Sequence, residues 1–171
     1  MDNSAASKPD IMHDLNEAPW PWLDSSAEAM LFNHSLEHMG RETTTFLGII
    51  QEIYRVGCDG AVVTINVPHP RHDNFLNDPT HVRAVTPEML SMFDRQQNEQ
   101  WVAAKASNTA LGLYLGVDLT MTNVTAVLDD VYQRQLQTGA VKPAEISQLA
   151  RERNNVIAEF RMELRVRKPA S

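Results

Sequence analysis

Five of the six histidines lie in two short stretches of the sequence, residues 34–38 and 69–81. His34 and His38 stand four positions apart with Glu37 between them, so one helical turn would bring both imidazoles to the same side, as a shared metal ion requires. An unperturbed imidazole also titrates at about pH 6.5, which suits it to take a proton from a substrate hydroxyl. The first stretch is therefore a candidate for metal binding, for acid–base chemistry, or for hydrogen bonding at the rim of a sheet.

The second stretch belongs to a long polar segment, residues 68–85, that is rich in histidine, aspartate and arginine. A loop of this length inside a compact domain is often functional. We predict that it contacts a substrate, and the alternative is local hydrogen bonding, with Asp78-Pro79-Thr80 as a turn. The residues assigned to catalysis are His34, His69 and His72, and those assigned to substrate contact are Arg71, Asp78 and His81.

A metal ion would need more ligands than the first stretch supplies. Two imidazoles need a third and a fourth ligand to hold an ion well, and the loop offers His69, His72, Asp73, Asp78 and His81. Their spacing fits no specific metal motif. Cys58 is the only cysteine, so neither a disulfide within the chain nor a cysteine-based metal cage is expected. We therefore assign no metal site from the sequence.

The elements that must position the first stretch are two strands and a helix. Residues 27–32 (AEAMLF) and 61–67 (AVVTINV) are apolar enough for strands buried in a sheet. Between them, residues 42–56 carry apolar side chains at intervals of three and four, as an amphipathic helix does. Ligands bind at the carboxyl ends of parallel strands, so the polar residues Asn33 and His34, which follow the first strand, mark the place for a site.

The remaining pattern predicts a mixed α/β protein, and a length of 171 residues fits a single domain, residues 1–171. The last strand candidate alternates apolar and charged side chains, which is typical of a strand with one wet face. Residues 94–116 are ambiguous. The expected elements are a strand at 10–14 (DIMHD), a helix from the cap Thr86 and Pro87 to about Phe93, a strand at 117–128, a helix at 143–153 and a strand at 156–166.

Composition excludes several classes of function. An apolar fraction of 43% and a charged fraction of 22% are ordinary for a soluble globular protein. The net charge of -7 disfavours a nucleic acid as partner, because such binding draws on clustered Lys and Arg. No apolar run reaches the roughly 18–20 residues that span a bilayer, and residues 1–20 lack a signal pattern. We therefore expect no membrane partner and a cytoplasmic location.

Four blocks of the sequence, in this order and at similar spacing, resemble a class I S-adenosylmethionine-dependent methyltransferase domain: PDIMHDLNEAPWPW, LFNHSLEHM, GIIQEIYRVGCDGAVVTINVPHP and NDPTHVRAVTPEMLSMF. The resemblance implies a Rossmann-like α/β sheet, mostly parallel with an antiparallel C-terminal strand pair, in which DIMHD matches the family's third strand and AEAMLF its fourth. The family's first strand and helix, with the glycine-rich cofactor turn, have no counterpart, since the first glycine is Gly40. An N-terminally truncated domain with an exposed sheet edge is implied, and a homodimer through that edge is plausible on physical grounds.

The resemblance also implies a site for S-adenosylmethionine, with binding weakened or lost because the glycine-rich turn is missing. It places Asp14 near the adenine amino group, Asn33 and His34 along the cofactor, and Asp2 at the ribose hydroxyls. The expected function is methyl transfer to a small-molecule acceptor, with the catalytic histidines named above orienting it or taking its proton. The alternatives are a catalytically inactive methyltransferase-like protein that acts in binding or assembly, and a histidine-rich metal-dependent hydrolase.

Overall fold

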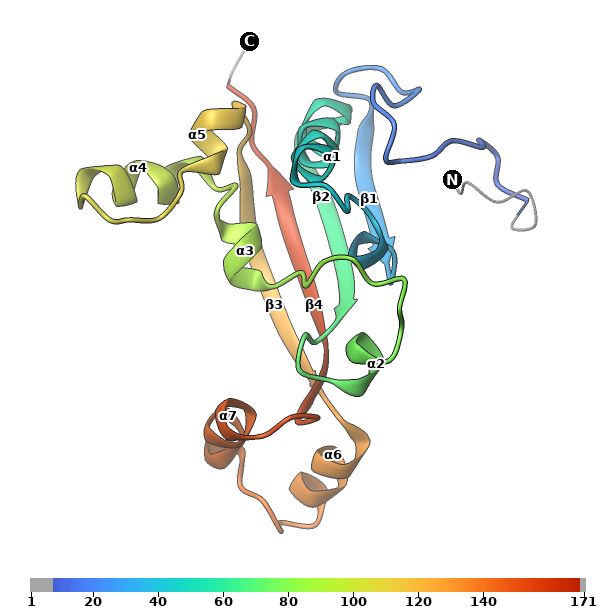
Figure 1. Cartoon of the computed structure of the whole chain (residues 1–171). Coiled ribbons are helices and arrows are strands. Elements are labelled where there is room, and N and C mark those ends of the chain that lie inside the picture. The colour runs from blue at the N-terminus through green and yellow to red at the C-terminus, as the bar shows by residue number, and fades with distance from the viewer. Residues whose placement is uncertain (1–7, 170–171) are drawn as a thin grey trace.

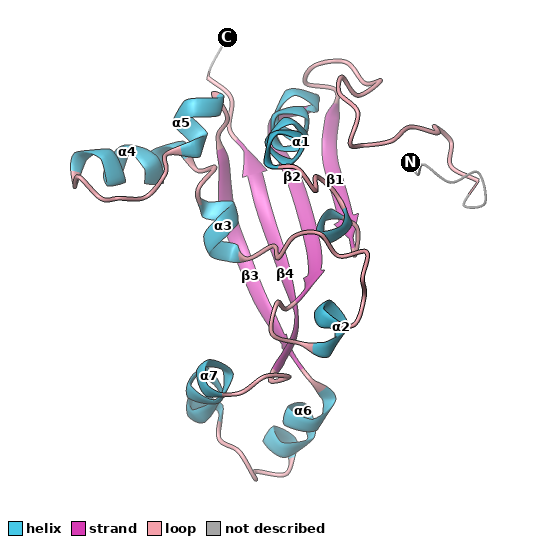
Figure 2. Ribbon diagram, in the orientation of Figure 1, coloured by secondary structure: helices cyan, strands magenta, loops and turns pink. Residues whose placement is uncertain are grey.

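Figures 1 and 2 show the computed structural model of the chain, which describes residues 8–169. In chain order the elements are β1 (Ala27–Asn33), the 3-10 helix η2 (Leu36–His38), α1 (Thr43–Val56), β2 (Gly57–Pro68), α2 (Asp73–Leu76), α3 (Pro87–Ser91), α4 (Arg95–Ala103), α5 (Leu111–Leu115), β3 (Leu119–Leu128), α6 (Asp130–Gln137), α7 (Pro143–Glu152) and β4 (Ile157–Val166). The four strands form one sheet. α1 and α3 lie against one of its faces, and α6 and α7 lie beyond one end of the strands (Figure 1).

The sheet has the strand order β1-β2-β4-β3. β1 and β2 are parallel, and α1 makes the crossover between them. β4 is antiparallel to both of its neighbours, β2 and β3. The mixed α/β architecture and the antiparallel pair at the C-terminal end are therefore confirmed, with β1 and β2 as the parallel pair among the described strands.

The core lies between α1 and the sheet. The helix buries its apolar stripe, as the spacing in the sequence predicted, and β2 and β4 supply the facing side chains. Full burial of an aliphatic or aromatic side chain stabilises a fold by about 1.5–3 kcal/mol, so this contact is the main reason that helix and sheet assemble. The buried residues are Phe46, Ile49, Ile50 and Ile53 on the helix and Val63, Ile65, Val67, Met162 and Leu164 on the strands.

β4 follows the alternation seen in its sequence. Met162, Leu164 and Val166 are buried, while Arg161 and the other charged residues between them are exposed. Successive side chains of a strand point to opposite faces, so this sheet has one face in the core and one in water at β4. The prediction of a final strand with a wet face is confirmed.

Residues 10–14 do not form the predicted strand. Apart from a single bridge at Met12, this segment is irregular, and the side chains of Ile11 and Met12 are exposed. The chain turns instead, because the side chain of Asp14 accepts a hydrogen bond from the backbone N–H of Asn16 at 2.9 Å. Aspartate commonly forms such local turns, and a short segment becomes a strand only where a neighbouring strand pairs with it.

Helices occupy most of the ambiguous segment 94–116, as α4 and α5, and α6 was not predicted at all. α4 and α6 carry many polar residues, and α5 has only five residues, too few to show a helical repeat in the sequence. The predicted start of α3 is confirmed, because the hydroxyl of Thr86 accepts a hydrogen bond from the backbone N–H of Met89 at 3.2 Å. The capping residue therefore predicted the start of α3, whereas apolar periodicity did not predict α4, α5 or α6.

An ion-pair network ties the irregular segment before β1 to α1. Glu52 is buried, and one of its carboxylate oxygens accepts hydrogen bonds from the backbone N–H of Trp20 and from Arg55, both at 2.6 Å. Arg55 also donates to the carbonyls of Trp20 and Trp22 and to Asp24. The hydrogen bond from Arg55 is the largest cause that lowers the pKa of Glu52. The network thus holds the two tryptophans beside the helix.

β1 is an edge strand of the sheet. Most of its residues are at least partly exposed, and the side chain of Leu31 is 66% exposed. An edge strand offers unpaired backbone N–H and C=O groups to any further strand. The exposed edge expected from the sequence is therefore present, on the side of β1 away from β2.

Candidate functional site

The carboxyl ends of β1 and β2 form a polar rim. Asn33 ends β1, and its side-chain carbonyl accepts a hydrogen bond from the amide of Asn66 on β2 at 2.9 Å. The next residue, His34, donates its backbone N–H to the carbonyl of Asn66 at 2.9 Å and has a positive φ of 49°. Because the strands are parallel, their carboxyl ends lie side by side at the same end of the sheet. Open α/β folds bind their ligands at that end.

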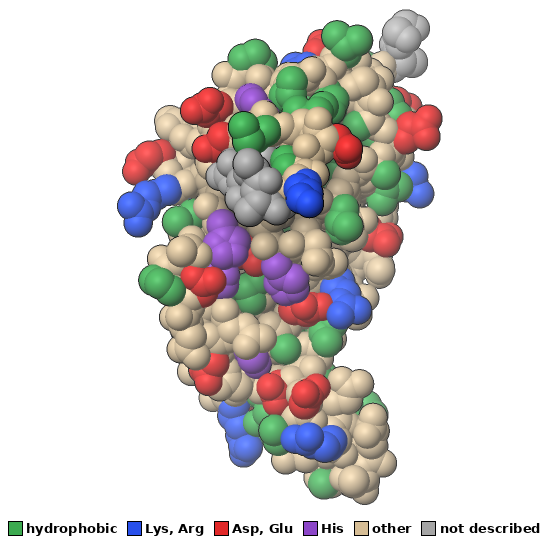
Figure 3. All heavy atoms as spheres, turned by 90° about the vertical axis from the view of Figure 1, so that its right-hand side faces the viewer, with side chains coloured by type: hydrophobic (Ala, Val, Ile, Leu, Met, Phe, Trp, Pro, Cys, Tyr) green, Lys and Arg blue, Asp and Glu red, His purple; other side chains and the backbone are tan. Residues whose placement is uncertain are grey.

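His34 lies between two carboxylates at this rim. Its Nε2 is 3.1 Å from Oε2 of Glu159 on β4, and its Nδ1 is 3.6 Å from Oε1 of Glu37 on η2. The side chain of His34 is 47% exposed, so a ligand can reach the ring. Figure 3 shows histidine side chains gathered with acidic ones on the side of the molecule where β1 forms the sheet edge. A histidine held in this way can orient a substrate hydroxyl or amine, or take its proton.

His69 directly follows β2. Its ring packs on Phe160 with 4.9 Å between centroids, and its Nδ1 accepts a hydrogen bond from the backbone N–H of Arg71 at 3.1 Å. Burial, together with the positive charge of Arg71, lowers the pKa of His69 below its ordinary value. The ring is therefore neutral at neutral pH, and its proton sits on Nε2, because Nδ1 must keep its lone pair as an acceptor.

We predict that His69 makes the protein less stable in mild acid. Its pKa is lowered in the folded state, so the unfolded chain binds the proton first, at about pH 6.5, and stability is lost as the pH falls from there through the folded pKa. The measurement is urea unfolding of the wild type and of His69→Gln at about pH 7 and about pH 5. The free energy of unfolding of the wild type should fall relative to that of the variant at the lower pH. An unchanged difference would contradict the prediction.

The contacts of His72 and Arg71 favour a structural role. Nδ1 of His72 accepts from the backbone N–H of Asn74 at 3.0 Å, and its Nε2 is 3.2 Å from Asp129, so both ring nitrogens are engaged. The guanidinium of Arg71 donates to the carbonyls of Ala150 and Arg151 at the end of α7. These side chains fasten the loop after β2 to the segment that carries α6 and α7.

Asp78 and His81 lie further along the same loop. Asp78 accepts hydrogen bonds from the hydroxyl of Thr80 at 2.6 Å and from its backbone N–H at 2.8 Å, and these bonds lower the pKa of Asp78. The ring of His81 stacks on Phe75 with 5.1 Å between centroids. The Asp78-Pro79-Thr80 turn expected from the sequence is present, and it places His81 beside His38, with 4.5 Å between the two ring centroids.

Asp2 and Asp14 are the two aspartates that the resemblance assigned to the cofactor. Asp2 lies outside the described residues. Asp14 stands on a turn and not at the end of a strand, and its carboxylate orients Asn16 through the side-chain amide at 2.8 Å. Asn16 in turn accepts a hydrogen bond from the backbone N–H of Gly40 at 2.8 Å. Asp14 thus helps to hold the irregular N-terminal segment to the chain after η2.

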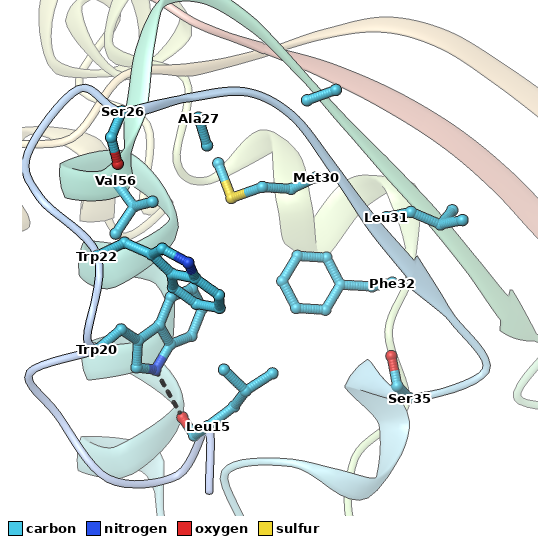
Figure 4. A pocket seen from close by; sticks show the side chains of 11 residues that line it. Leu15, Trp20, Trp22, Ser26, Ala27, Met30, Leu31, Phe32, Ser35 and Val56 are labelled. Carbon is cyan, nitrogen blue, oxygen red and sulfur yellow. Dashed lines mark hydrogen bonds between the residues drawn. The ribbon is translucent and has the colours of Figure 1, made fainter. Parts of the chain in front are cut away.

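A largely apolar cavity of about 470 Å³ lies beside β1, and sequence analysis did not predict it. Figure 4 shows Trp20 and Trp22 on one side of it and Met30 and Phe32 on the other, while Leu31 points away. The two indole rings meet edge to face, with centroids 6.1 Å apart. The volume is within the range of about 300–1,000 Å³ that small-molecule sites occupy. Two tryptophans spaced two residues apart, just before a strand, were its only signal in the sequence.

The cavity and the polar rim adjoin each other along the chain. Phe32 and Ser35 line the cavity, and they flank Asn33 and His34, which stand at the rim. Alternate residues of a strand point to opposite sides, so residues at the end of β1 contribute to both the cavity and the polar rim. We define the candidate site as this cavity together with the rim residues Asn33, His34, Asn66 and Glu159.

Comparisons with known proteins bear on the fold. No protein-family model matches the sequence. No curated protein matches it either. Among solved structures, the chain is similar to a SAM-dependent methyltransferase from Archaeoglobus fulgidus, with a TM-score of 0.55, 16% identity and coverage of 91% of this chain and 66% of that one. It is also similar to a SAM-dependent methyltransferase from Methanosarcina mazei, with a TM-score of 0.51, 11% identity and coverage of 93% and 67%.

These similarities define the class of fold. The chain has a class I S-adenosylmethionine-dependent methyltransferase-like fold, as the sequence resemblance implied. It spans about two thirds of the length of either protein. At 11% and 16% identity the likeness concerns the fold alone. Among the described residues, no helix combines the length and the apolar character needed to cross a membrane.

Proposed function

We propose that this protein acts in methyl transfer from S-adenosylmethionine to a small-molecule acceptor. The observation that carries the proposal is the position of the candidate site within a methyltransferase-like fold. Asn33 and His34 stand at the carboxyl end of β1, next to an apolar cavity large enough for a small molecule. Open α/β sheets bind their ligands at the carboxyl ends of their strands.

The cavity fits the flat, weakly polar adenine ring of the cofactor. Trp20, Trp22 and Phe32 offer aromatic surfaces to such a ring, and Ser35 offers a hydroxyl at the end of the cavity near the rim. The charged amino-acid end of the cofactor would need backbone N–H groups of the kind that a glycine-rich turn presents. The residues that line the cavity include no glycine, so the proposed contact with the cofactor is made mainly by the aromatic walls.

When bound, the cofactor supplies an electrophilic methyl group, and the protein's part is to orient the acceptor toward it. His34 is the group best placed for this, because it is exposed at the rim and its Nε2 lies 3.1 Å from Glu159. His34 would take the proton that the acceptor's oxygen or nitrogen loses. Neither His72 nor Arg71 is free for this role, since His72 contacts Asn74 and Asp129 and Arg71 donates to a carbonyl of α7.

Calorimetric titration with S-adenosylmethionine tests the proposal directly. Binding to the wild type is expected, and Trp22→Ala should weaken it, since about 1–3 kcal/mol is lost with one stacking aromatic ring. Trp101→Ala is the matched control, because Trp101 lies on α4 and does not line the cavity. Transfer of a labelled methyl group to a panel of small nucleophiles then identifies the acceptor. No binding at millimolar cofactor would refute the proposal.

A second candidate function is binding or assembly without catalysis. The observation that favours it is the exposed edge of β1, where Leu31 is 66% exposed beside an open cavity. A second copy of the chain could add its own β1 to this edge and extend the sheet. Sedimentation would then show a dimer that Leu31→Lys disrupts. A dimer together with no cofactor binding would favour this function, whereas a monomer that binds the cofactor would favour methyl transfer.

A further inference from the structure

Three side chains from two distant parts of the sequence converge beneath the polar rim. Glu37 and His38 lie on η2, and His81 lies near the end of the loop after β2. The backbone N–H groups of Val82 and Arg83 both donate to the carbonyl of Glu37, at 2.9 and 3.2 Å, and so hold the loop against η2. One ligand atom from each of the three side chains lies within 4.8 Å of the other two. We infer that Glu37, His38 and His81 bind a divalent transition-metal ion, Zn²⁺ in the first instance.

Glu37 provides the strongest argument. Its side chain is only 1% exposed, and neither carboxylate oxygen has a hydrogen-bond partner among the described residues. Nδ1 of His34 lies 3.6 Å from Oε1 of Glu37, which is beyond hydrogen-bonding distance. Buried carboxylates are normally hydrogen-bonded, paired or bound to a metal, because an unsatisfied one is costly. A metal ion would satisfy this carboxylate where the protein itself does not.

The hydrogen bonds of the two histidines prepare them as ligands. Nδ1 of His81 lies 2.8 Å from the carbonyl of Phe75, which can only accept, so this nitrogen carries the proton and Nε2 has a free lone pair. The hydroxyl of Thr80 gives its proton to Asp78, so it accepts from Nδ1 of His38 at 2.9 Å. Nε2 of His38 is then free as well. Metal-binding histidines typically donate their second ring N–H to such a partner.

The ligand set indicates which ion fits. Two imidazoles and one carboxylate suit Zn²⁺ and related transition metals, whereas Mg²⁺ and Ca²⁺ prefer oxygen ligands. Ligands about 2.1 Å from a tetrahedral zinc ion lie about 3.4 Å apart, and a turn of the exposed His38 side chain would close the remaining gap. His38 is exposed while Glu37 and the His81 side chain are buried, so a fourth position faces solvent. Sites with three protein ligands and an open position commonly bind water or a substrate there.

The test is a calorimetric titration of the chelator-treated full chain with Zn²⁺. The wild type should bind a single ion, and Glu37→Gln and His81→Ala should each weaken binding by about 100-fold or more, since loss of an outer partner alone costs about 10–100-fold. Thr80→Val removes such a partner and should fall within that smaller range. His13→Ala is the control for adventitious binding, because His13 lies outside the cluster and its hydrogen bond among residues 8–169 is to the carbonyl of Glu17.

A folding control keeps the result decisive. Glu37→Gln keeps the size of the side chain, and circular dichroism of each metal-free variant shows whether it has folded. Zn²⁺ should raise the melting temperature of the wild type and of His13→Ala but not that of Glu37→Gln. No Zn²⁺ binding by the wild type, or equal binding by Glu37→Gln and His81→Ala, would overturn the inference. These measurements require no methyltransferase activity, so they stand apart from the function proposed above.

Discussion

Arg55→Ala should lower the free energy of unfolding by about 3 kcal/mol, the lower end of the range for breaking a buried ion pair. The side chain of Glu52 is 10% exposed and would lose its ionic partner, and the carbonyls of Trp20 and Trp22 would lose their donor. A quarter of the Arg55 side chain, 26%, is exposed, which limits the cost. Urea unfolding at neutral pH measures the effect.

A double variant and a pH series separate the ion pair from simple packing. Glu52→Gln combined with Arg55→Met removes both charges and should be less destabilising than Arg55→Ala alone, because no buried charge is left unpaired. The wild type should also lose stability as the pH falls below about 4.5, through the lowered pKa of Glu52, and this loss should be smaller in Arg55→Ala. A change in stability of less than about 0.5 kcal/mol in Arg55→Ala, the usual size for a surface substitution, would contradict the assigned role.

His34→Asn should lower the rate of methyl transfer by about 10²–10⁴-fold, the usual range for a group that transfers a proton in the reaction. Asparagine is the suitable replacement because His34 has a φ of 49°, and asparagine tolerates this left-handed conformation better than most residues. The fold should therefore remain intact while the ring between Glu37 and Glu159 is lost. The measurement is transfer of labelled methyl from S-adenosylmethionine to the acceptor found in the screen.

The kinetic pattern distinguishes positioning from a general loss of structure. His34→Asn should reduce kcat more than it changes the affinity for S-adenosylmethionine, because the proposed cofactor contacts are those of the cavity walls and not of His34. His13→Asn is the matched control and should keep the wild-type rate, since the hydrogen bond of His13 to a described residue is a local one, to the carbonyl of Glu17. A His34→Asn variant with an unchanged kcat would refute the role of His34 in catalysis.

Elements with strong apolar periodicity were predictable from the sequence. α1 and β4 appear close to their predicted bounds, and β2 includes the predicted strand 61–67 but begins four residues earlier, at Gly57. Each of the three buries a regular stripe of side chains in the core. The rim position of Asn33 and His34 was predictable because they directly follow a parallel strand, although β1 is mostly exposed and not buried as its sequence suggested. The start of α3 was predictable from the local chemistry of Thr86 and Pro87 alone.

Other features depended on neighbours that a local pattern cannot reveal. The segment 10–14 was predicted to be a strand, yet it turns at Asp14, because strand formation requires a pairing partner. The cavity beside β1 exists because Glu52 and Arg55, on the second half of α1, hold Trp20 and Trp22 over it. His72 was assigned to catalysis because it lies in a polar loop, but its Nε2 lies 3.2 Å from Asp129, which is 57 residues away along the chain.

The sequence predicted the class of fold through the resemblance of four blocks to a known family, and it predicted the rim at the end of β1 because Asn33 and His34 directly follow a strand. It was not enough to identify the partners of the histidines. Glu37 and His38 meet His81 only because the loop after β2 returns to η2, where two backbone hydrogen bonds hold it. The resemblance in sequence therefore pointed to methyl transfer, whereas the inference of a metal site came from contacts between residues that are distant along the chain.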